Sequence, residues 1–256
     1  MALGTVPKIV AIIPARHAST RFPGKVLTPL AGKPLVIHAY ERTRQASLVS
    51  ETIIATDDER VRDAVEPYGA KVAMTRPGHP SGTDRIAEVA EGSDADIIVN
   101  VQADEPLIDP ATIDAAIQPL LEFSDLPMAT ARHLISDLTD LEDPNVVKVV
   151  CDANGRALYF SRASIPHVRD EDEGHAPPRD HWQHVGLYVY RRDFLLKYAR
   201  MSATPLEKLE KLEQLRVLEN GYPIAVVDTN YRSIGVDTPG DLVRVRELLE
   251  QGSSTT

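Results

Sequence analysis

A continuous run of branched apolar residues near the N-terminus, Ile9-Val-Ala-Ile-Ile13, constrains the fold most strongly. Its apolar positions are consecutive and do not alternate, which indicates a strand buried on both faces, as in a parallel sheet. Three further strand-like segments follow, at Glu51–Thr56, Lys71–Met74 and Asp96–Val101. The helical stretches that separate these strands cover about Pro34–Gln45, Glu59–Tyr68 and Thr83–Glu91. Strands that alternate with helices favour right-handed βαβ units, so we expect an α/β fold with a mostly parallel central sheet and helices on both faces.

The second half of the sequence is less regular and predicts a smaller β-rich excursion. Two apolar segments, Val146–Val150 and Ala157–Phe160, flank the turn residues Asp152–Gly155 and indicate a hairpin. From Arg169 to His181 the chain is charged and rich in proline, which indicates a long surface loop or lid. A further strand is expected at Val185–Tyr190.

The C-terminal part predicts two helices with one strand between them. Thr204-Pro-Leu-Glu207 is a capping box, and the helix that it opens carries leucines at every third position from Leu206 to Leu218. This apolar stripe either packs on the sheet or forms a subunit contact. A strand at Pro223–Asp228 and a helix at Pro239–Leu249 follow.

Length and charge limit the classes of function. The chain has 256 residues, a net charge of −10 and one cysteine, Cys151. We expect a single domain over residues 1–250, with the hairpin and lid as an excursion around 146–190 and a flexible tail over 251–256. The acidic balance disfavours a nucleic-acid or anionic-membrane partner, because phosphate backbones need a basic face. One cysteine cannot form an intrachain disulfide and no apolar run is long enough to span a membrane, so we expect a cytoplasmic enzyme without membrane insertion.

The loop after the first strand carries the candidate phosphate-binding residues. It places three cations, Arg16, Arg21 and Lys25, within ten residues, among small residues that let backbone N–H groups approach an anion. The first βα loop of an open parallel sheet commonly holds phosphates, so the pattern favours a triphosphate site over a solvated basic loop. The loop matches neither a dinucleotide fingerprint nor a P-loop, since Gly24-Lys25 is followed by Val26. A dehydrogenase and a P-loop ATPase are therefore disfavoured.

Two acidic positions are candidate metal ligands. Asp104 and Glu105 follow the strand at Asp96–Val101 and should lie at the same sheet edge as the first loop. A carboxylate there is well placed for Mg²⁺, which favours one or two carboxylates together with substrate phosphates. Asp237 directly precedes the last helix, where a helix cap is the alternative to a metal ligand. For Asp104 the alternative is a turn residue before Pro106.

Several blocks in the same order resemble the bacterial 3-deoxy-manno-octulosonate (Kdo) cytidylyltransferases. The resemblance spans Ile9 to about Glu250, and its blocks are Pro14-Ala-Arg16, Ser19-Thr-Arg-Phe-Pro-Gly-Lys25, Ser81-Gly-Thr83, Gln102-Ala-Asp-Glu-Pro106, Tyr159-Phe-Ser-Arg162, His184-Val-Gly-Leu-Tyr188, Leu212-Glu-Gln-Leu-Arg216 and Gly235-Val-Asp-Thr-Pro239. This family implies a nucleotide-diphospho-sugar transferase-like fold and a Mg²⁺-dependent reaction of CTP with Kdo. It also implies CMP-Kdo and pyrophosphate as products, a role in lipopolysaccharide biosynthesis, and a homodimer.

The resemblance also implies roles for individual residues. The implied nucleotide-binding residues are Pro14, Ala15, Arg16, Ser19, Arg21, Lys25, Arg76, Ser81, Gly82 and Thr83. The implied Kdo-binding residues are Gln102, Arg162, His184, Tyr188, Glu213 and Gln214. Asp104 and Asp237 become the expected Mg²⁺ ligands, and together with Arg16, Arg21 and Lys25 they form the expected catalytic set. One departure is Ala103, where the family usually has glycine, which matters if that position needs a positive φ.

Several alternatives stay open at this point. His184 could be a core histidine, Arg162 could pair with a structural acid, and Gln214 could face solvent. A glycosyltransferase that uses a nucleotide sugar, or a catalytically silent nucleotide-binding protein, would share the fold. Within the family reading, 8-amino-Kdo or a sialic acid could replace Kdo as the acceptor.

Overall fold

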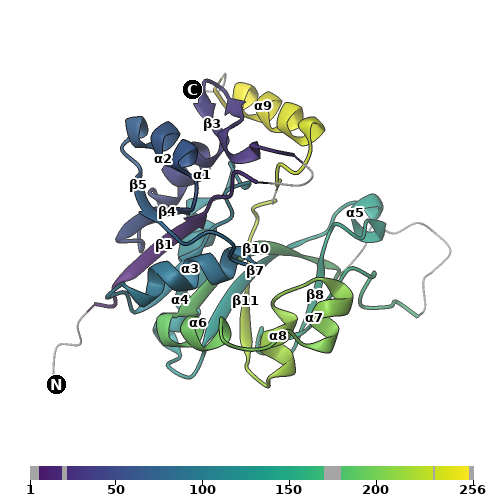
Figure 1. The fold of residues 1–256 in the computed structure, drawn as a ribbon. Coiled ribbons are helices and arrows are strands. Elements are labelled where there is room, and N and C mark those ends of the chain that lie inside the picture. Colours follow the sequence, from purple (N-terminus) through teal and green to yellow (C-terminus); the bar gives the residue numbers. More distant parts are fainter. Residues whose placement is uncertain (1–5, 19–21, 170–179, 233, 254–256) are drawn as a thin grey trace. The chain divides into compact units, whose positions relative to one another are not determined.

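The computed structural model describes residues 6–18, 22–169, 180–232 and 234–253 (Figure 1). The chain forms two compact units. Unit 1 comprises Met1–Asp114, Arg191–Ala199 and Ser233–Thr256, and unit 2 comprises Ala115–Tyr190 and Arg200–Arg232. The single domain over residues 1–250 stays a prediction, because compact units of this kind need not be independent domains.

Unit 1 contains a parallel sheet in the order β6–β1–β4–β5. Its strands are β1 (Ile9–Pro14), β4 (Glu51–Thr56), β5 (Lys71–Met74) and β6 (Ile97–Asn100). Residues 9–13 of β1 are almost fully buried, which confirms the prediction from the continuous apolar run. The predicted bounds of β4 and β5 are confirmed, and β6 is one residue shorter at each end than predicted.

Two helices of unit 1, α2 (Glu59–Val65) and α3 (Gly82–Glu91), begin at residues with recognisable capping chemistry. Asp58 caps α2 by accepting from the Arg60 N–H, and Ser81 and Asp84 form a capping box at the start of α3. Gly69, with φ 72°, ends the predicted helix before β5. The helices of unit 1 are α1 (Leu35–Thr43), α2 (Glu59–Val65), α3 (Gly82–Glu91), α6 (Arg192–Tyr198), α9 (Pro239–Ser253) and the first residues of α4 (Pro110–Glu122). Unit 1 also contains the 3₁₀ turns η1 (Lys25–Leu27) and η2 (Glu66–Tyr68) and a two-stranded antiparallel sheet of β2 (Pro29–Leu30) and β3 (Lys33–Pro34).

The end of the last helix differs from the prediction. Helix α9 runs to Ser253, so residues 251–253 are helical and do not belong to the expected flexible tail. The rest of that tail, 254–256, lies outside the described residues.

The strand order explains where a ligand site is expected in unit 1. The chain moves from β1 to β4 to β5 in one direction, and then returns past β1 to β6. Right-handed crossovers therefore place α1 and α2 on one face of the sheet and α3 on the other. The carboxyl ends of β1 and β6 are the switch point, which is where ligands bind in open α/β sheets.

Unit 2 is mainly antiparallel. Strand β7 pairs with β10 and β8 pairs with both β9 and β10 in antiparallel fashion, whereas β11 pairs with β7 in parallel. Its strands are β7 (Met128–Leu134), β8 (Lys148–Cys151), β9 (Ala157–Ser161), β10 (Trp182–Arg191) and β11 (Ile224–Asp228), and its helices are α5 (Leu138–Glu142), α7 (Pro205–Glu210), α8 (Leu215–Glu219) and the second part of α4. The β8–β9 pair confirms the predicted hairpin. Of the predicted lid, residues 170–179 lie outside the described part of the chain.

The long leucine-striped helix predicted after Thr204 is wrong. Helix α7 ends at Glu210, Lys211 adopts a left-handed conformation with φ 54°, and α8 begins only at Leu215. A residue in this conformation ends helical hydrogen bonding, so the leucines do not form one stripe, and Leu209 is 79% exposed. The predicted capping role of Glu207 is confirmed, since its carboxylate accepts from the Thr204 N–H at 3.0 Å.

Within the described residues, no helix is both long and apolar enough to cross a membrane.

Candidate active site

Lys25 is held in a fixed position at the carboxyl end of β1. Gly24 precedes it with φ 72°, a left-handed conformation that favours glycine, and the Gly24 N–H donates to the His17 carbonyl at 3.0 Å. Lys25 then begins the 3₁₀ turn η1 and is only 9% exposed. The sequence thus folds the loop back on itself and directs a buried ammonium group toward the sheet edge.

Two carboxylates converge on the Lys25 ammonium group. Its Nζ donates to Asp104 Oδ2 at 2.7 Å and to Asp237 Oδ1 at 3.0 Å. Burial alone would lower the pKa of Lys25, but the attraction and hydrogen bonds of Asp104 and Asp237 outweigh it and raise this pKa. The structure therefore brings together Lys25, Asp104 and Asp237, three of the residues expected to be catalytic.

Asp237 is not the cap of the last helix. Thr238 and Asp241 cap α9 instead, because the Thr238 N–H donates to the Asp241 carboxylate and the Asp241 N–H donates to Thr238 Oγ1. The neighbouring Val236 is fully buried in an apolar cluster and donates its N–H to the Asp104 carbonyl at 2.9 Å. The backbone that carries Asp237 is thus fixed to the backbone of Asp104, and the Asp237 carboxylate pairs with the Lys25 ammonium group.

The paired carboxylates fit a Mg²⁺ site that includes substrate phosphates. Their oxygens approach one and the same ammonium group, and Mg²⁺ typically takes one or two carboxylates, with phosphate and water as its other ligands. The described residues contain no cluster of three or more acidic, histidine or cysteine side chains that would form an all-protein metal cage. Ala103 is buried and is not among the described residues with positive φ, so alanine is unstrained where the family usually has glycine.

Two further nucleotide-binding candidates of unit 1, Arg16 and Gly82, lie near the end of β1. Arg16 is half-buried, and its Nη2 is buried without a hydrogen-bond partner among the described residues, so this nitrogen can donate a hydrogen bond to an anion. A Cβ on Gly82 would lie 3.2 Å from Pro14 Cγ, so the start of α3 packs closely against the last residue of β1. Ser19 and Arg21 lie outside the described residues.

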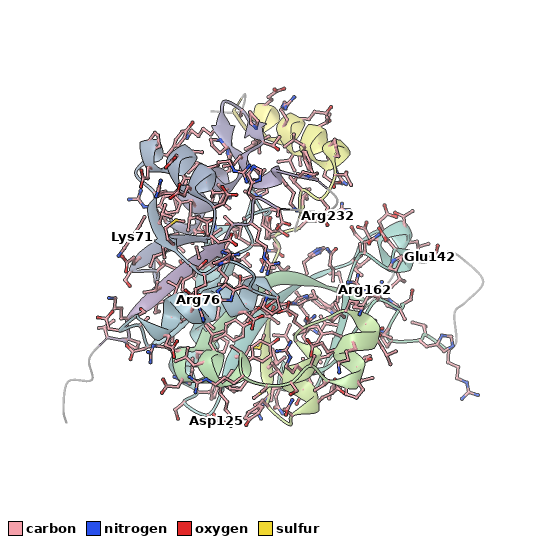
Figure 2. All side chains as sticks on the ribbon, viewed as in Figure 1. Lys71, Arg76, Asp125, Glu142, Arg162 and Arg232 are labelled. Carbon is pink, nitrogen blue, oxygen red and sulfur yellow. The ribbon has the colours of Figure 1, made fainter. Side chains whose placement is uncertain are left out.

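Arg76 and Gln102 contact neighbouring polar side chains in unit 1. The Arg76 side chain, which Figure 2 labels, is 78% exposed, and it pairs with Glu88 at 3.3 Å. Gln102 follows β6 and donates to Asn100 Oδ1 at 3.0 Å. Sequence reasoning missed Glu88 and its neighbour Arg85, since no motif distinguishes them from solvated helix residues.

His184 and Tyr188 form an aromatic cluster in unit 2. The His184 ring lies edge-on to Phe160, with centroids 5.0 Å apart, and 5.3 Å from Tyr188. Its Nε2 lies 3.0 Å from Thr130 Oγ1, and this hydroxyl donates to the Leu187 carbonyl at 2.6 Å. Thr130 Oγ1 therefore accepts from His184, which requires the proton on Nε2. Burial lowers the pKa of His184 to about 3, so the ring is neutral at physiological pH.

Gln214 is buried and does not face solvent. It is 3% exposed at the start of α8, and its Oε1 accepts from the Tyr188 hydroxyl at 3.2 Å. Its Nε2 is buried and has no hydrogen-bond partner in the part of the chain that the structure describes. Burial, and then the neighbouring Glu213 carboxylate, raises the pKa of Tyr188, so its hydroxyl stays a proton donor.

Arg162 is oriented by backbone carbonyls. The side chain, which Figure 2 labels, donates through Nε to the Glu210 carbonyl at 2.7 Å and through Nη1 to the Pro144 carbonyl at 2.8 Å. The Glu210 carboxylate accepts from the Arg162 main-chain N–H at 3.0 Å, and its negative charge also attracts the Arg162 guanidinium. Unit 2 therefore presents a fixed positive charge at Arg162 and neutral polar groups at His184 and Gln214.

The neutral state of His184 predicts a specific pH dependence of stability. Between pH 7 and pH 5 the unfolded chain protonates this histidine near its ordinary pKa of 6.5, whereas the folded chain does not. Stability should therefore fall with decreasing pH, and the contribution of this single site should reach about 2 kcal/mol at pH 5. Urea unfolding of wild-type protein and His184→Gln at pH 5, 6 and 7 measures this contribution as a difference in slope. Parallel pH profiles for the two proteins would contradict it.

The fold and the converging charges define a nucleotidyltransferase-like protein, and comparisons with known proteins agree. Residues 10–229 match the family model described as cytidylyltransferase. The chain is 60% identical to the 3-deoxy-manno-octulosonate cytidylyltransferases of Geobacter metallireducens and Geotalea uraniireducens, over 95% of this chain and 98% and 100% of theirs. A solved structure of CMP:2-keto-3-deoxy-manno-octonic acid synthetase complexed with CTP is 41% identical, with a TM-score of 0.87 over 96% of this chain and 99% of that chain. A nucleotidyl transferase from Methanothermobacter thermautotroptrophicus, 15% identical with a TM-score of 0.61, shares the fold.

The chain therefore belongs to the 3-deoxy-manno-octulosonate cytidylyltransferases.

Proposed function

We propose that this chain transfers CMP from CTP to 3-deoxy-D-manno-octulosonate, giving CMP-Kdo and pyrophosphate. The observation that carries the proposal is the meeting of Lys25, Asp104 and Asp237 at one sheet edge, in a chain 60% identical to proteins named for this reaction. In this reaction the anomeric oxygen of Kdo bonds to the α-phosphorus as the bond from that phosphorus to the pyrophosphate oxygen breaks. The hydroxyl proton is released to solvent.

Charge neutralisation is the main task of the residues in unit 1. Lys25 and Arg16 lie on the loop after β1, where they would offset the charge that develops on the leaving pyrophosphate. Asp104 and Asp237 would hold Mg²⁺, which when bound polarises the α-phosphate and lowers the pKa of a nearby hydroxyl. Arg21 would add a third cation on the same loop.

Acceptor recognition falls mainly to unit 2. Kdo carries a carboxylate, and the charged Arg162 suits it because a guanidinium can bind a carboxylate through two parallel hydrogen bonds. Because His184 is neutral, it would form hydrogen bonds to sugar hydroxyls and would not bind the carboxylate. Tyr188, Glu213 and Gln214 would also bind sugar hydroxyls. Gln102, which follows β6, is a further candidate for a hydroxyl contact.

We further propose that the protein works in the cytoplasm as a homodimer and supplies lipopolysaccharide assembly. The single cysteine supports a reducing compartment. The homodimer and the pathway follow from the resemblance of the sequence blocks to the family.

A substrate panel tests the proposal. Pyrophosphate release is measured with Mg²⁺ and each of CTP, UTP, ATP and GTP, with and without Kdo, 8-amino-Kdo or a sialic acid. We expect release that requires both CTP and Kdo. Release with 8-amino-Kdo alone would change the acceptor and keep the reaction. The absence of release with every acidic sugar would contradict the proposal and favour a silent CTP-binding protein. In a parallel incubation with a nucleotide sugar in place of the triphosphate, transfer of the sugar would favour a glycosyltransferase.

A further inference from the structure

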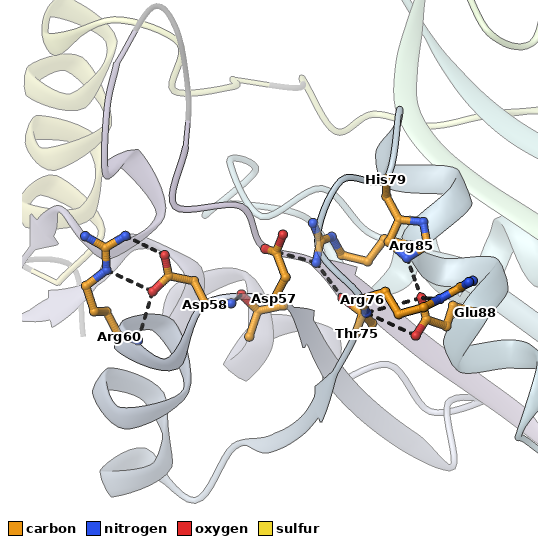
Figure 3. Close-up of polar contacts among 9 residues, drawn as sticks. Asp57, Asp58, Arg60, Thr75, Arg76, His79, Arg85 and Glu88 are labelled. Atoms are coloured by element: carbon orange, nitrogen blue, oxygen red, sulfur yellow. Dashed lines mark hydrogen bonds and ion pairs between the residues drawn. The ribbon is translucent and has the colours of Figure 1, made fainter.

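Arg85 is a buried cation that the nucleotide and metal assignments do not use. Its side chain is 2% exposed, although it lies on α3 in the block that follows Ser81–Thr83. Its Nη1 contacts Asp57 Oδ1 at 3.1 Å and donates to Thr75 Oγ1 (Figure 3). Buried arginine is costly unless it is paired, so its position calls for a physical reason.

The two partners of Arg85 lie at the carboxyl ends of neighbouring strands. Asp57 directly follows β4 and Thr75 directly follows β5. The Thr75 N–H donates to the Thr56 carbonyl at 2.8 Å, so these two strand ends are also joined through the backbone. Arg85 therefore ties α3 to the sheet edge at which ligands bind in open α/β folds.

Glu88 holds the next residues of the same loop. Its carboxylate accepts from the Arg76 N–H at 3.1 Å and from Arg76 Nε at 3.3 Å, and it also contacts His79 Nε2 (Figure 3). Burial would raise the pKa of Glu88, but the hydrogen bonds from Arg76 and His79 outweigh it and lower this pKa. The Glu88 side chain is 23% exposed, so this carboxylate is a partly shielded anchor.

Arg85 and Glu88 both lie on the side of α3 that, from the pattern of apolar residues, is expected to face solvent. At about 100° per residue, Arg85 and Glu88 lie opposite the buried stripe of α3. That stripe consists of Thr83, Ile86, Ala87 and Ala90. One side of α3 thus packs on the sheet, while Arg85 and Glu88 on the other side hold residues 75–79 through hydrogen bonds and ion pairs.

The loop that Arg85 and Glu88 hold, residues 75–79, is adjacent in sequence to candidate nucleotide-binding residues. It contains Arg76 and continues into Ser81, the N-terminal cap of α3. At the first residue of that helix, Gly82 packs against Pro14 at the end of β1. The loop between β5 and α3 is therefore fixed by Arg85 and Glu88 on one side and by Pro14 on the other.

The geometry points to Arg85 and Glu88 as positioning residues that hold residues 75–83 for recognition of the pyrimidine base of the nucleotide. This inference rests on the proposed function. Cytosine and uracil differ at position 4, where cytosine has an amino donor and uracil a carbonyl acceptor, and at N3, which accepts in cytosine and donates in uracil. Discrimination between them requires hydrogen-bonding groups held in place to a fraction of an ångström. Two anchors on one rigid helix provide such a constraint on a loop.

The test compares equilibrium binding of CTP and UTP by calorimetry, with Mg²⁺ and no sugar. The proteins are wild type, Glu88→Gln, Arg85→Lys and the control Glu59→Gln, which makes the same change at an exposed residue on α2. We expect Glu88→Gln and Arg85→Lys to bind CTP about 5- to 10-fold more weakly and to lose most of the preference for CTP over UTP. In turnover assays the KM for CTP should rise, while kcat at saturating CTP stays within about 2-fold of wild type.

The outcomes separate this inference from the proposed function. If wild-type protein binds CTP but does not turn over Kdo, the proposed acceptor is wrong, and the comparison of CTP and UTP binding still tests the roles of Arg85 and Glu88. An unchanged CTP-to-UTP preference in Glu88→Gln would overturn the inference, as would wild-type protein that binds both nucleotides equally or binds neither. A fall in kcat with unchanged CTP affinity would also overturn it, because it would indicate a general structural role. If Arg85→Lys does not fold, Glu88→Gln still decides the question.

Discussion

Replacing Asp104 with alanine is expected to lower kcat by at least about 10³-fold while leaving the fold intact. The expected loss reflects the several kcal/mol of charge stabilisation that a metal ligand supports in phosphoryl-transfer chemistry. The fold should survive because the Asp104 side chain is 32% exposed and its described contact is the ion pair with Lys25. The backbone contact between Val236 and the Asp104 carbonyl is kept in the variant.

Matched substitutions separate the effect of losing the Asp104 charge from the effect of changing the side-chain volume. Asp104→Asn retains the volume and one oxygen but removes the charge, and we expect it to be nearly as inactive as alanine. Asp94→Asn makes the same change in an exposed pair with Lys8 and should keep wild-type kcat. Circular dichroism and kcat are measured for all three. Near-wild-type turnover in Asp104→Ala would remove this residue from the catalytic set.

Replacing Arg216 with methionine is expected to destabilise the protein by about 3–5 kcal/mol, because it leaves the buried Glu207 carboxylate without its cation. The two side chains are 14% and 10% exposed, and Arg216 Nε donates to Glu207 Oε2 at 2.8 Å while Nη2 donates to Oε1 at 2.5 Å. This bidentate pair lowers the pKa of Glu207 although burial raises it. It also joins α7 to α8 across the left-handed Lys211.

Urea unfolding measures the effect, and two further variants control it. Arg60→Met removes an arginine whose side chain is 66% exposed and should cost less than about 1 kcal/mol. Adding Glu207→Gln to Arg216→Met should restore part of the lost stability, because it removes the uncompensated charge. A loss below about 1 kcal/mol in Arg216→Met would show that the pair is not effectively buried.

The sequence predicted the parallel part of the fold well because its signals are local. The buried strand β1 is a continuous apolar run, and the ends of α2 and α3 are determined by side chains next to them, Asp58 and Ser81. Elements with weak local signals were not predicted. Strand β7 alternates small and polar residues, and α4 contains Pro119, which in a sequence resembles a helix end.

Two further features could not be predicted from local sequence patterns. The break between α7 and α8 depends on Lys211 in a conformation that lysine rarely adopts, so leucine periodicity alone predicted a continuous helix. From its position before the last helix alone, Asp237 was compatible with a helix cap as well as with a metal ligand, and the structure places it against Lys25, which lies 212 positions earlier in the chain. The resemblance to the family implied the metal role of Asp237, but only the fold shows that it shares one cation with Asp104.

The same reasoning explains why Arg85 and Glu88 were not identified from the sequence. A charged residue opposite the apolar stripe of a helix usually faces solvent. Here the chain after β5 covers that side of α3, which no local pattern indicates.

We propose that the residues at the carboxyl ends of β1 and β6 support transfer of CMP to Kdo with Mg²⁺. A ³¹P NMR time course of wild-type protein with CTP, Kdo and Mg²⁺, run beside a sample with excess EDTA, tests it most directly. We predict that the CTP resonances are replaced by those of a sugar phosphodiester and pyrophosphate, and only when Mg²⁺ is available. CTP that persists unchanged with Mg²⁺ and Kdo, or that is converted to CMP without a sugar phosphodiester, would contradict the account.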